Sequence, residues 1–482
     1  MAAVDLLQPI RALKLRYVPL LMIYFAYGAL GVIDVTRDVW VKEALTLSPA
    51  ELAAIGVWLT LPWTIKVVFG ELVDSVAIFG SRRRVYILIG ATFTAAGMLT
   101  LAAAAGRWFD GAPGLAAMYV LGMLLIVIGT VIQDVVADAM STEVVPRTDE
   151  KGEPRPDEEV RAELGMVQVL GRLALSIGIL AVAGLSGYLA KALGRETVFL
   201  LGLVIPAISV TGVFLIRSEV GEPRAIDWRL LGGGLAFGAV VLSLALGDVP
   251  YSQEWIFAVS MIVVCTMLYM ITRDVDPKTQ RAILFTTIVI FAFRATPGVG
   301  DGYFWWTLDV LKFDEAFYGH LRQTAAIIGL VALWLLSKPI TEYRVTAVLF
   351  WLTVAGFVLS APNIALFYGI HEWTEAQFGF GARSIALIDA ATSSPFAQLS
   401  MVPLLTLIAY YAPAGHRATW FALMASLMNL ALVAGQLGTK YLNVVFTVGR
   451  GAYDELGMLL IAAAVLGFLI PIAAIVAFGR RI

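Results

Sequence analysis

Long apolar runs separated by short polar segments dominate this chain of 482 residues. A helix needs about 20 predominantly apolar residues to cross a bilayer. Runs of about this length lie near residues 17–36, 52–72, 85–105, 116–140, 163–190, 196–216, 229–247, 254–272, 281–305, 319–336, 345–361, 385–411, 418–444 and 456–478. The pattern predicts an all-α polytopic membrane protein with about 14 transmembrane helices.

The composition supports this class and excludes several others. The chain is 60% hydrophobic and 15% charged, whereas soluble domains are about 25% charged. A net charge of −2 offers nucleic acid no basic surface. The single Cys265 and three scattered histidines exclude a disulfide framework and predict no metal site. Phosphate-binding glycine loops and nucleophile elbows are also missing from the sequence, so we expect neither an enzyme nor a bound cofactor.

Positive charges predict the orientation. If the N-terminus is inside and the spans alternate, the inside segments hold more than twice as many lysines and arginines as the outside segments. This bias predicts that both termini lie in the cytoplasm. The charged stretch Val145–Arg161 becomes a cytoplasmic loop. No cleavage site follows the first apolar run, so we expect it to be retained. These features favour a bacterial cytoplasmic membrane, although a plastid protein without its transit peptide would look alike.

A repeat organises the spans. GVID at Gly31–Asp34 matches GVGD at Gly298–Asp301, 267 residues later. ALTLSPA at Ala44–Ala50 is echoed by VLKFDEA at Val310–Ala316 at nearly the same offset. Repeated halves are common in transporters. The predicted organisation is a six-helix bundle over residues 1–220, an inserted hairpin over 221–280 and a second six-helix bundle over 281–482.

Three cations fall within predicted spans. A charge in hydrocarbon costs at least about 2.5–3.5 kcal/mol, so each is a functional candidate. Lys66, Arg172 and Arg294 would together suit an anionic substrate, and arginine binds carboxylates in a bidentate manner. Alternatively, each cation pairs with a nearby acid and joins helices. Arg294 opens the sequence RATPGVGD, where Pro297 and the glycines predict a broken helix that lines a binding cavity.

Acids form a second group of candidates. Asp34 and Asp38 share a helix face with Arg37 between them, and either could carry a coupling proton. The alternative is a helix end neutralised by its own arginine. Asp301, the repeat equivalent of Asp34, and Asp389, in the polar stretch LIDAATSSP, are candidates for substrate binding.

Charges near the inner ends of the spans predict a cytoplasmic gate. Such contacts must break and reform as a transporter changes conformation. The negative charge of Asp74, at the end of the second span, would also interact favourably with the N-terminus of a neighbouring helix. The gate candidates are Asp74, Arg82, Arg83, Arg84, Asp134 and Asp138.

One stretch resembles a known family. Gly70, Asp74, Gly80 and Arg82–Arg84 are similar to the loop between helices two and three of the major facilitator superfamily. The wider form here, D-S-V-x-I-F-G-x-R-R-R-x-Y, resembles the folate–biopterin transporter family, a branch of that superfamily. Further similar stretches are Tyr24–Gly31, Leu61–Ser75, Asp134–Met140, Ala295–Phe304, Leu387–Asp389 and Ala412–Asn429.

The resemblance implies a major facilitator fold and the transport of folates, pterins or related compounds, in some members by proton symport. We therefore expect a monomeric secondary transporter that moves a folate- or pterin-like anion across the bilayer by alternating access. The alternative is a non-transporting protein on the same fold, which assists membrane assembly or pigment delivery through a partner surface on the hairpin.

Overall fold

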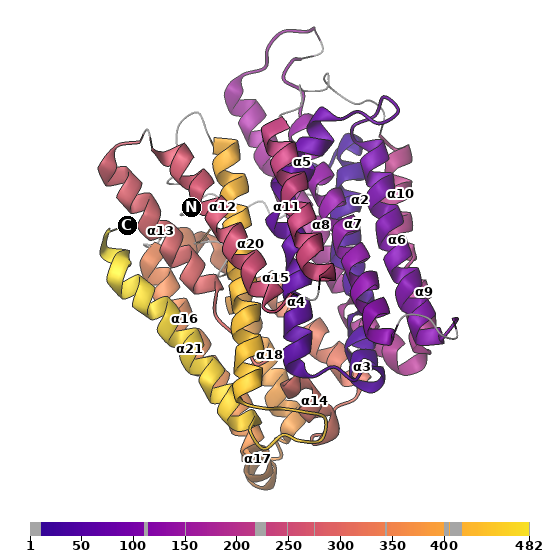
Figure 1. Cartoon of the computed structure of the whole chain (residues 1–482), viewed down its shortest axis with the longest axis vertical. Helices are drawn as coiled ribbons and strands as arrows, with labels where there is room; N and C mark the ends of the chain where they lie inside the picture. Colours follow the sequence, from indigo (N-terminus) through magenta and orange to yellow (C-terminus); the bar gives the residue numbers. More distant parts are fainter. Residues whose placement is uncertain are drawn as a thin grey trace. The chain divides into compact units, whose positions relative to one another are not determined.

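The computed structural model describes residues 11–109, 114–149, 151–216, 228–247, 249–273, 275–342, 345–399, 404 and 417–481. The chain forms two compact units. We name them the N-terminal unit, Met1–Trp40 with Val68–Gly234, and the C-terminal unit, Val41–Val67 with Leu235–Ile482. The described residues form helices and connecting segments, with no β-strand among them (Figure 1).

The helices of the N-terminal unit carry the first part of the chain. They are η1 (Leu15–Tyr17), α2 (Val18–Ala29), η2 (Leu30–Ile33), α3 (Asp34–Ala44), α5 (Lys66–Ser75), α6 (Arg84–Gly106), α7 (Leu115–Glu143), α8 (Asp157–Ala192), α9 (Arg195–Leu201), α10 (Val204–Phe214) and α11 (Trp228–Leu246). Three of them, α3, α5 and α11, cross a boundary between the units.

The C-terminal unit contains α4 from the first part of the chain and all later helices. They are α4 (Pro49–Thr64), α12 (Ser252–Thr272), α13 (Pro277–Arg294), α14 (Gly302–Asp309), α15 (Glu315–Glu342), α16 (Val345–Phe367), α17 (Ile370–Phe378), α18 (Ala382–Leu399), α20 (Arg417–Val445), α21 (Leu456–Phe478) and η3 (Gly479–Arg481).

The predicted class, an all-α polytopic membrane protein, is confirmed. Within the described ranges, 9 helices are long and apolar enough to cross a membrane. Helices α11 and α12 occupy the residues of the predicted hairpin, and α12 is among the nine. The total of 14 spans stays a prediction. The boundary at residues 220–221 and, apart from residue 404, the part of the twelfth span from residue 400 onward lie outside the described residues.

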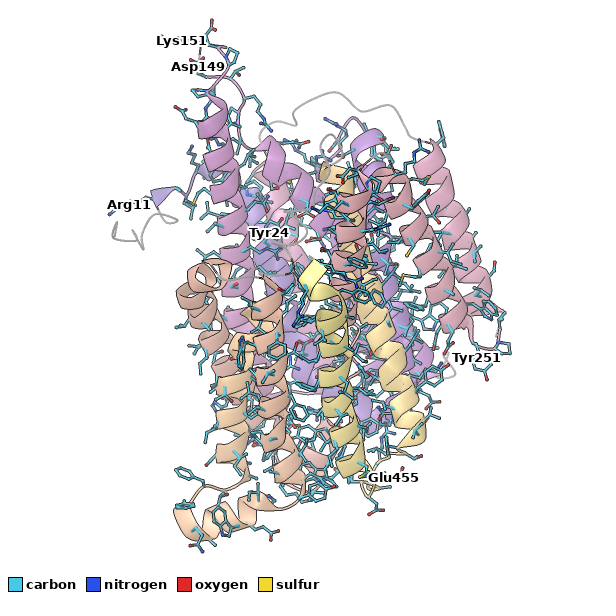
Figure 2. The ribbon with its side chains drawn as sticks, turned by 90° about the vertical axis from the view of Figure 1, so that its left-hand side faces the viewer. Arg11, Tyr24, Asp149, Lys151, Tyr251 and Glu455 are labelled. Atoms are coloured by element: carbon cyan, nitrogen blue, oxygen red, sulfur yellow. The ribbon has the colours of Figure 1, made fainter. Side chains whose placement is uncertain are left out.

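The polar loop that follows α7 is shorter than predicted. Helix α8 begins at Asp157, directly after Pro156, so the charged residues from this point onward are helical. A backbone turn brings Thr148 opposite Pro154. Asp149 and Lys151 lie at the tip of this loop, beyond the end of α8 (Figure 2).

Glycines allow α6 and α7 to pack closely in the N-terminal unit. A Cβ atom added to Gly90 would lie 2.7 Å from the carbonyl oxygen of Gly129. One added to Gly129 would lie 2.7 Å from the backbone nitrogen of Thr94. Small residues let membrane helices approach until their backbones touch, and van der Waals contact then holds them together.

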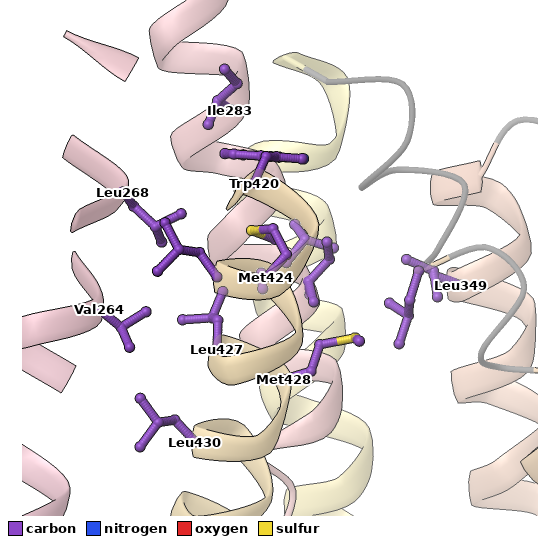
Figure 3. Packing of buried hydrophobic residues seen from close by; sticks show 14 of the residues in the cluster. Val264, Leu268, Ile283, Leu349, Trp420, Met424, Leu427, Met428 and Leu430 are labelled. Carbon is purple, nitrogen blue, oxygen red and sulfur yellow. The ribbon is translucent and has the colours of Figure 1, made fainter. Parts of the chain in front are cut away.

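Helix α20 is the centre of the C-terminal unit. Its buried side chains, among them Trp420, Met424 and Leu427, pack against α12, α13 and α21, and Leu349 of α16 belongs to the same cluster. Val264 and Leu268 of α12 belong to the same apolar cluster (Figure 3). The second helix of the predicted hairpin is therefore part of this core.

Two helices are interrupted at equivalent places of the repeat. In the first, the 3₁₀ segment Leu30–Ile33 separates α2 from α3. In the second, residues 295–301 leave the helical conformation between α13 and α14, which confirms the predicted break. Lys42 and Asp309 are also separated by the repeat offset of 267 residues, and these two equivalent residues form an ion pair.

We predict that Gly129→Leu destabilises the protein. The added side chain meets backbone atoms of α6, and overpacking of this kind costs about 1–3 kcal/mol. The measurement is the midpoint of thermal unfolding in detergent. Gly238→Leu on α11 is the matched control, since a Cβ atom there meets nothing within 4 Å. Equal midpoints for the two variants would contradict the close packing of α6 and α7.

Candidate functional site

A cavity opens beside the interruption at residues 295–301, within the C-terminal unit. Its volume is about 370 Å³, which lies in the usual range for small-molecule sites. We call it the interruption cavity. Its lining residues are Leu52, Ala53, Gly56, Arg294, Thr296, Gly298, Gly300, Asp301, Leu432, Gly435, Gln436 and Thr439.

The interruption exposes backbone groups that α20 partly satisfies. The amide of Gly298 donates to Thr439 Oγ1 over 2.8 Å, and Asn443 Nδ2 donates to the carbonyl of Val299 over 3.0 Å. A Cβ atom added to Gly435 would lie only 3.0 Å from the carbonyl oxygen of Thr296. The small and polar face of α20 thus holds the irregular segment in place, as irregular backbone at membrane depth requires.

The polar groups of the interruption cavity can bind an anion with a hydrogen-bonding ring. Arg294, the last residue of α13, supplies a guanidinium group suited to a carboxylate. Asp301 and Gln436, which also line the cavity, supply a carboxylate and an amide. The structure therefore brings together Arg294 and Asp301, two of the residues predicted to bind substrate.

Asp389 lines a second cavity of about 400 Å³, which we call the Asp389 cavity. Tyr303 Oη donates to Asn363 Oδ1 over 2.7 Å, and Asn363 Nδ2 donates to Asp389 Oδ2 over 3.2 Å. Thr296 lines both cavities. The interruption therefore has two cavities beside it, one lined by Arg294 and Asp301 and one lined by Asp389.

The aromatic residues that follow the interruption divide into packing and polar roles. Trp305 and Trp306 are buried, with 1% and 4% of their surfaces exposed. Arg450 lies over the Trp305 ring at 4.3 Å from its centre. Only Tyr303 enters a hydrogen-bonded chain beside a cavity.

The N-terminal unit presents a separate polar group. Tyr24 Oη donates to Asp138 Oδ1 over 3.0 Å. A Cβ atom at Gly171 would lie 2.8 Å from the Tyr24 ring, so this glycine lets the ring pack on α8 directly beside Arg172. Asp134 lines a small pocket with Tyr24. Arg172 and Asp138 are exposed on the unit's surface.

The acids predicted to carry a proton both bind one arginine. Arg37 Nη1 lies 2.9 Å from Asp34 Oδ1, and Arg37 Nη2 lies 2.7 Å from Asp38 Oδ1. The arrangement matches the alternative of an internally neutralised helix end. The role of these acids in proton coupling stays a prediction.

Comparisons with known proteins now identify the family. A sequence profile of the BT1 family matches residues 28–480. The chain belongs to the BT1 family. The predicted resemblance is therefore confirmed, and the relatives are named as transporters rather than enzymes.

Several curated relatives cover most of the chain. A folate-biopterin transporter of Synechocystis sp. is 27% identical over 92% of this chain and 77% of its own length. Probable folate-biopterin transporter 4 of Arabidopsis thaliana is 22% identical over 91% of this chain and 90% of its own length. Folate transporter 2 of Plasmodium falciparum is 22% identical over 86% and 78%.

Solved structures show the same fold at low sequence identity. A POT family transporter in complex with 5-aminolevulinic acid has a TM-score of 0.66 at 12% identity, covering 97% of this chain and 96% of its own. A bacterial homologue of the human drug peptide transporters PepT1 and PepT2 has a TM-score of 0.59 at 14% identity, covering 98% and 97%. This BT1 family member is thus a multi-pass membrane protein with a transporter fold.

The predicted cations belong to both units. Lys66 begins α5 and belongs with Arg294 to the C-terminal unit, whereas Arg172 belongs to the N-terminal unit. Their convergence on one substrate stays a prediction.

The predicted gate residues have partners that the sequence pattern did not reveal. Arg83 Nη2 lies 2.9 Å from Asp74 Oδ1 and 2.5 Å from Glu143 Oε1. Arg84 donates to the carbonyl of Ile216. The sequence pattern did not indicate Glu143 as a partner of Arg83, because Glu143 lies past the apolar part of α7. A gating role for these residues stays a prediction.

A second set of polar contacts lies within the C-terminal unit. Asp309 accepts hydrogen bonds from Lys42 and Tyr453. Arg450 donates to the carbonyls of Lys42 over 2.7 Å and Leu47 over 2.8 Å. Burial opposes ionisation of Asp309, but these two donors lower the pKa of its carboxyl group. The contacts join the end of α3 and the segment after it to the last residue of α14 and to the segment before α21.

Glu163 is the hub of a charged cluster outside the apolar part of α8. Lys14 Nζ lies 2.5 Å from its Oε1, Arg155 Nη1 lies 2.9 Å from its Oε2, and Arg16 and Tyr17 also donate to it. Burial acts to raise the pKa of the Glu163 carboxyl group, but the four donors outweigh it and lower the pKa to about 2.

This shift predicts a pH dependence of stability. The carboxylate stabilises the folded protein fully above its ordinary pKa of 4.5, and the contribution is lost as the pH falls through about 2. Glu163→Gln should lower the unfolding midpoint at neutral pH and flatten its decline under acid. Glu159→Gln, on the same helix and 63% exposed, is the control. Identical acid profiles for wild type and Glu163→Gln would contradict the assignment.

Proposed function

We propose that this protein is a secondary transporter that moves a folate- or pterin-like organic anion by alternating access. The family assignment and the names of the relatives support transport of this substrate class. The structural observation that carries the proposal is Arg294 at the edge of a cavity beside an interrupted helix. Interrupted helices supply unpaired backbone groups for substrate binding in many transporters.

The chemistry of the interruption cavity suits the proposed substrate. Folate carries carboxylates at one end and a flat ring with donors and acceptors at the other. Arg294 would bind a carboxylate, while Asp301 and Gln436 offer an acceptor and an amide to a ring edge. Arg172 and Lys66 would add positive charge during the cycle. Leu52 and Leu432 supply the apolar walls that a flat ring requires.

The finer architecture belongs to the same proposal. Helices α11 and α12 would form a transmembrane hairpin inserted between two six-helix bundles, giving 14 spans. The excess of lysines and arginines supports cytoplasmic termini in a bacterial cytoplasmic membrane. Asp74, Arg82–Arg84, Asp134 and Asp138 would take part in the inner gate, and the protein would act as a monomer.

The test is uptake of labelled folate and of a reduced pterin by purified protein in liposomes. Arg294→Gln should lower the initial rate by at least about tenfold, because it removes a charged contact to the carboxylate. Arg294→Lys should retain part of the rate, since it keeps the charge without the bidentate geometry.

The matched control is Arg107→Gln, which removes the same charge from an exposed turn after α6. Its rate should equal that of wild type. Uptake of neither compound by wild-type protein would refute the substrate class. Unchanged uptake by Arg294→Gln would refute the site while leaving transport intact.

A further inference from the structure

The carboxylate of Asp389 has an unusual environment for an acid in a membrane protein. Among the described residues its only hydrogen-bond donor is Asn363, which binds Oδ2. Oδ1 is shielded from solvent and has no hydrogen-bond partner in the described part of the chain. The hydroxyl groups of Thr392 and Ser393 bind the backbone carbonyl of Asp389 instead of its side chain.

An ionised carboxylate is costly in such a place. Burying a charge without a counter-ion costs several kcal/mol, and the group usually takes up a proton instead. The described residues place no cation within ion-pair distance of Asp389. Asp34 and Asp38 differ in this respect, because both form ion pairs with Arg37.

The described titratable groups near Asp389 do not pair with its carboxylate. Helices α15, α16 and α17 pack against α18. The described side chains of α16 include no titratable group, and α18 itself carries Arg383, whose ion pair is with Asp314. The remaining titratable groups among the described side chains of α15 and α17 are Glu315, Tyr318, His320, Arg322, His371, Glu372 and Glu375. None of these hydrogen-bonds the Asp389 carboxylate, whereas Tyr303 of α14 reaches it through Asn363.

We propose that Asp389 is the residue that binds and releases the coupling proton during transport. The inference rests on the proposed function and adds its driving ion. A proton from water on one side of the membrane forms an O–H bond at the unpaired Oδ1 while Oδ2 keeps its bond from Asn363. The same bond breaks when the carboxylate meets water on the other side, so one proton crosses with each cycle.

The hydrogen-bonded chain offers a route from this proton to the substrate. Neutral Asp389 accepts more weakly from Asn363 than the carboxylate does. Asn363 in turn accepts from Tyr303, which lies two residues after Asp301 of the interruption cavity. Protonation therefore changes how firmly α14 is held, and α14 begins directly after Asp301. Asn363 and Tyr303 are positioning residues in this scheme.

Two assays in liposomes separate proton coupling from substrate binding. The first measures accumulation of labelled folate or reduced pterin driven by an inward proton gradient. The second measures exchange of labelled for unlabelled substrate at equal pH on both sides. Asp389 lines the Asp389 cavity and not the interruption cavity that we propose for the substrate. Asp389→Asn, which mimics the protonated acid, should therefore lose gradient-driven accumulation and keep exchange within about twofold of wild type, a change below about 0.5 kcal/mol.

The controls distinguish the possible failures. Asp454→Asn makes the same change in an exposed connecting segment and should behave as wild type. Exchange without any response to the gradient in wild type would overturn the proton role but keep transport. No exchange of either substrate in wild type would instead refute the proposed function. Gradient-driven accumulation by Asp389→Asn, or its loss in Asp34→Asn alone, would overturn the assignment to Asp389.

A second variant keeps the proposal testable if Asp389→Asn does not fold. Asn363→Ala removes the donor to Asp389 Oδ2 and leaves the acid in place. Because this hydrogen bond favours the ionised form, its loss should move the pH midpoint of gradient-driven uptake upward. A substrate affinity measured at low pH should stay close to that of wild type. An unchanged pH profile would contradict a hydrogen-bonded proton site at Asp389.

Discussion

The structure of the C-terminal unit depends on how the backbone at residues 295–301 is satisfied. A helix that stops inside a membrane leaves amide and carbonyl groups that hydrocarbon cannot solvate, and each costs several kcal/mol. Thr439 and Asn443 on α20 bind two of these groups, and Gly435 lets α20 approach the segment. The apolar cluster around Trp420 in turn fixes α20. The interruption cavity exists because this support allows α13 to end at Arg294.

The repeat explains why the interruption lies where it does. The two helices that carry the repeat are interrupted at equivalent positions. Lys42 and Asp309, which are equivalent in the repeat, contact each other. Elements that alternate between two states need contacts strong enough to hold one state and exposed enough to break. The contacts of Asp309 with Lys42 and Tyr453 in the C-terminal unit, and of Arg83 with Glu143 in the N-terminal unit, are candidates for this role, which stays a prediction. Asp389 has no counter-ion among the described residues, and under our proposal its change of charge would bias the cycle.

The sequence predicted the features that follow from local pattern. Apolar run length identified the membrane class, and Pro297 with its glycines identified the broken helix, because both signals are written in consecutive residues. The family was evident from the loop around Asp74. The partners were not predictable, since Thr439 lies 141 residues from Gly298 and Asn363 lies 60 from Tyr303. Threonine and asparagine within apolar helices carry no local signal that distinguishes a supporting role from ordinary packing.

The most direct test of the binding site is chemical protection of a cysteine placed in the interruption cavity. The chain has one native cysteine, so Cys265→Ser gives a clean background for Gln436→Cys on α20. A parallel protein with Glu455→Cys, in an exposed connecting segment, reports general access to the reagent. The account predicts that saturating folate or pterin slows thiol modification at residue 436 by at least about tenfold and leaves residue 455 unchanged. An unchanged rate at residue 436, in protein that still binds the substrate, would contradict it.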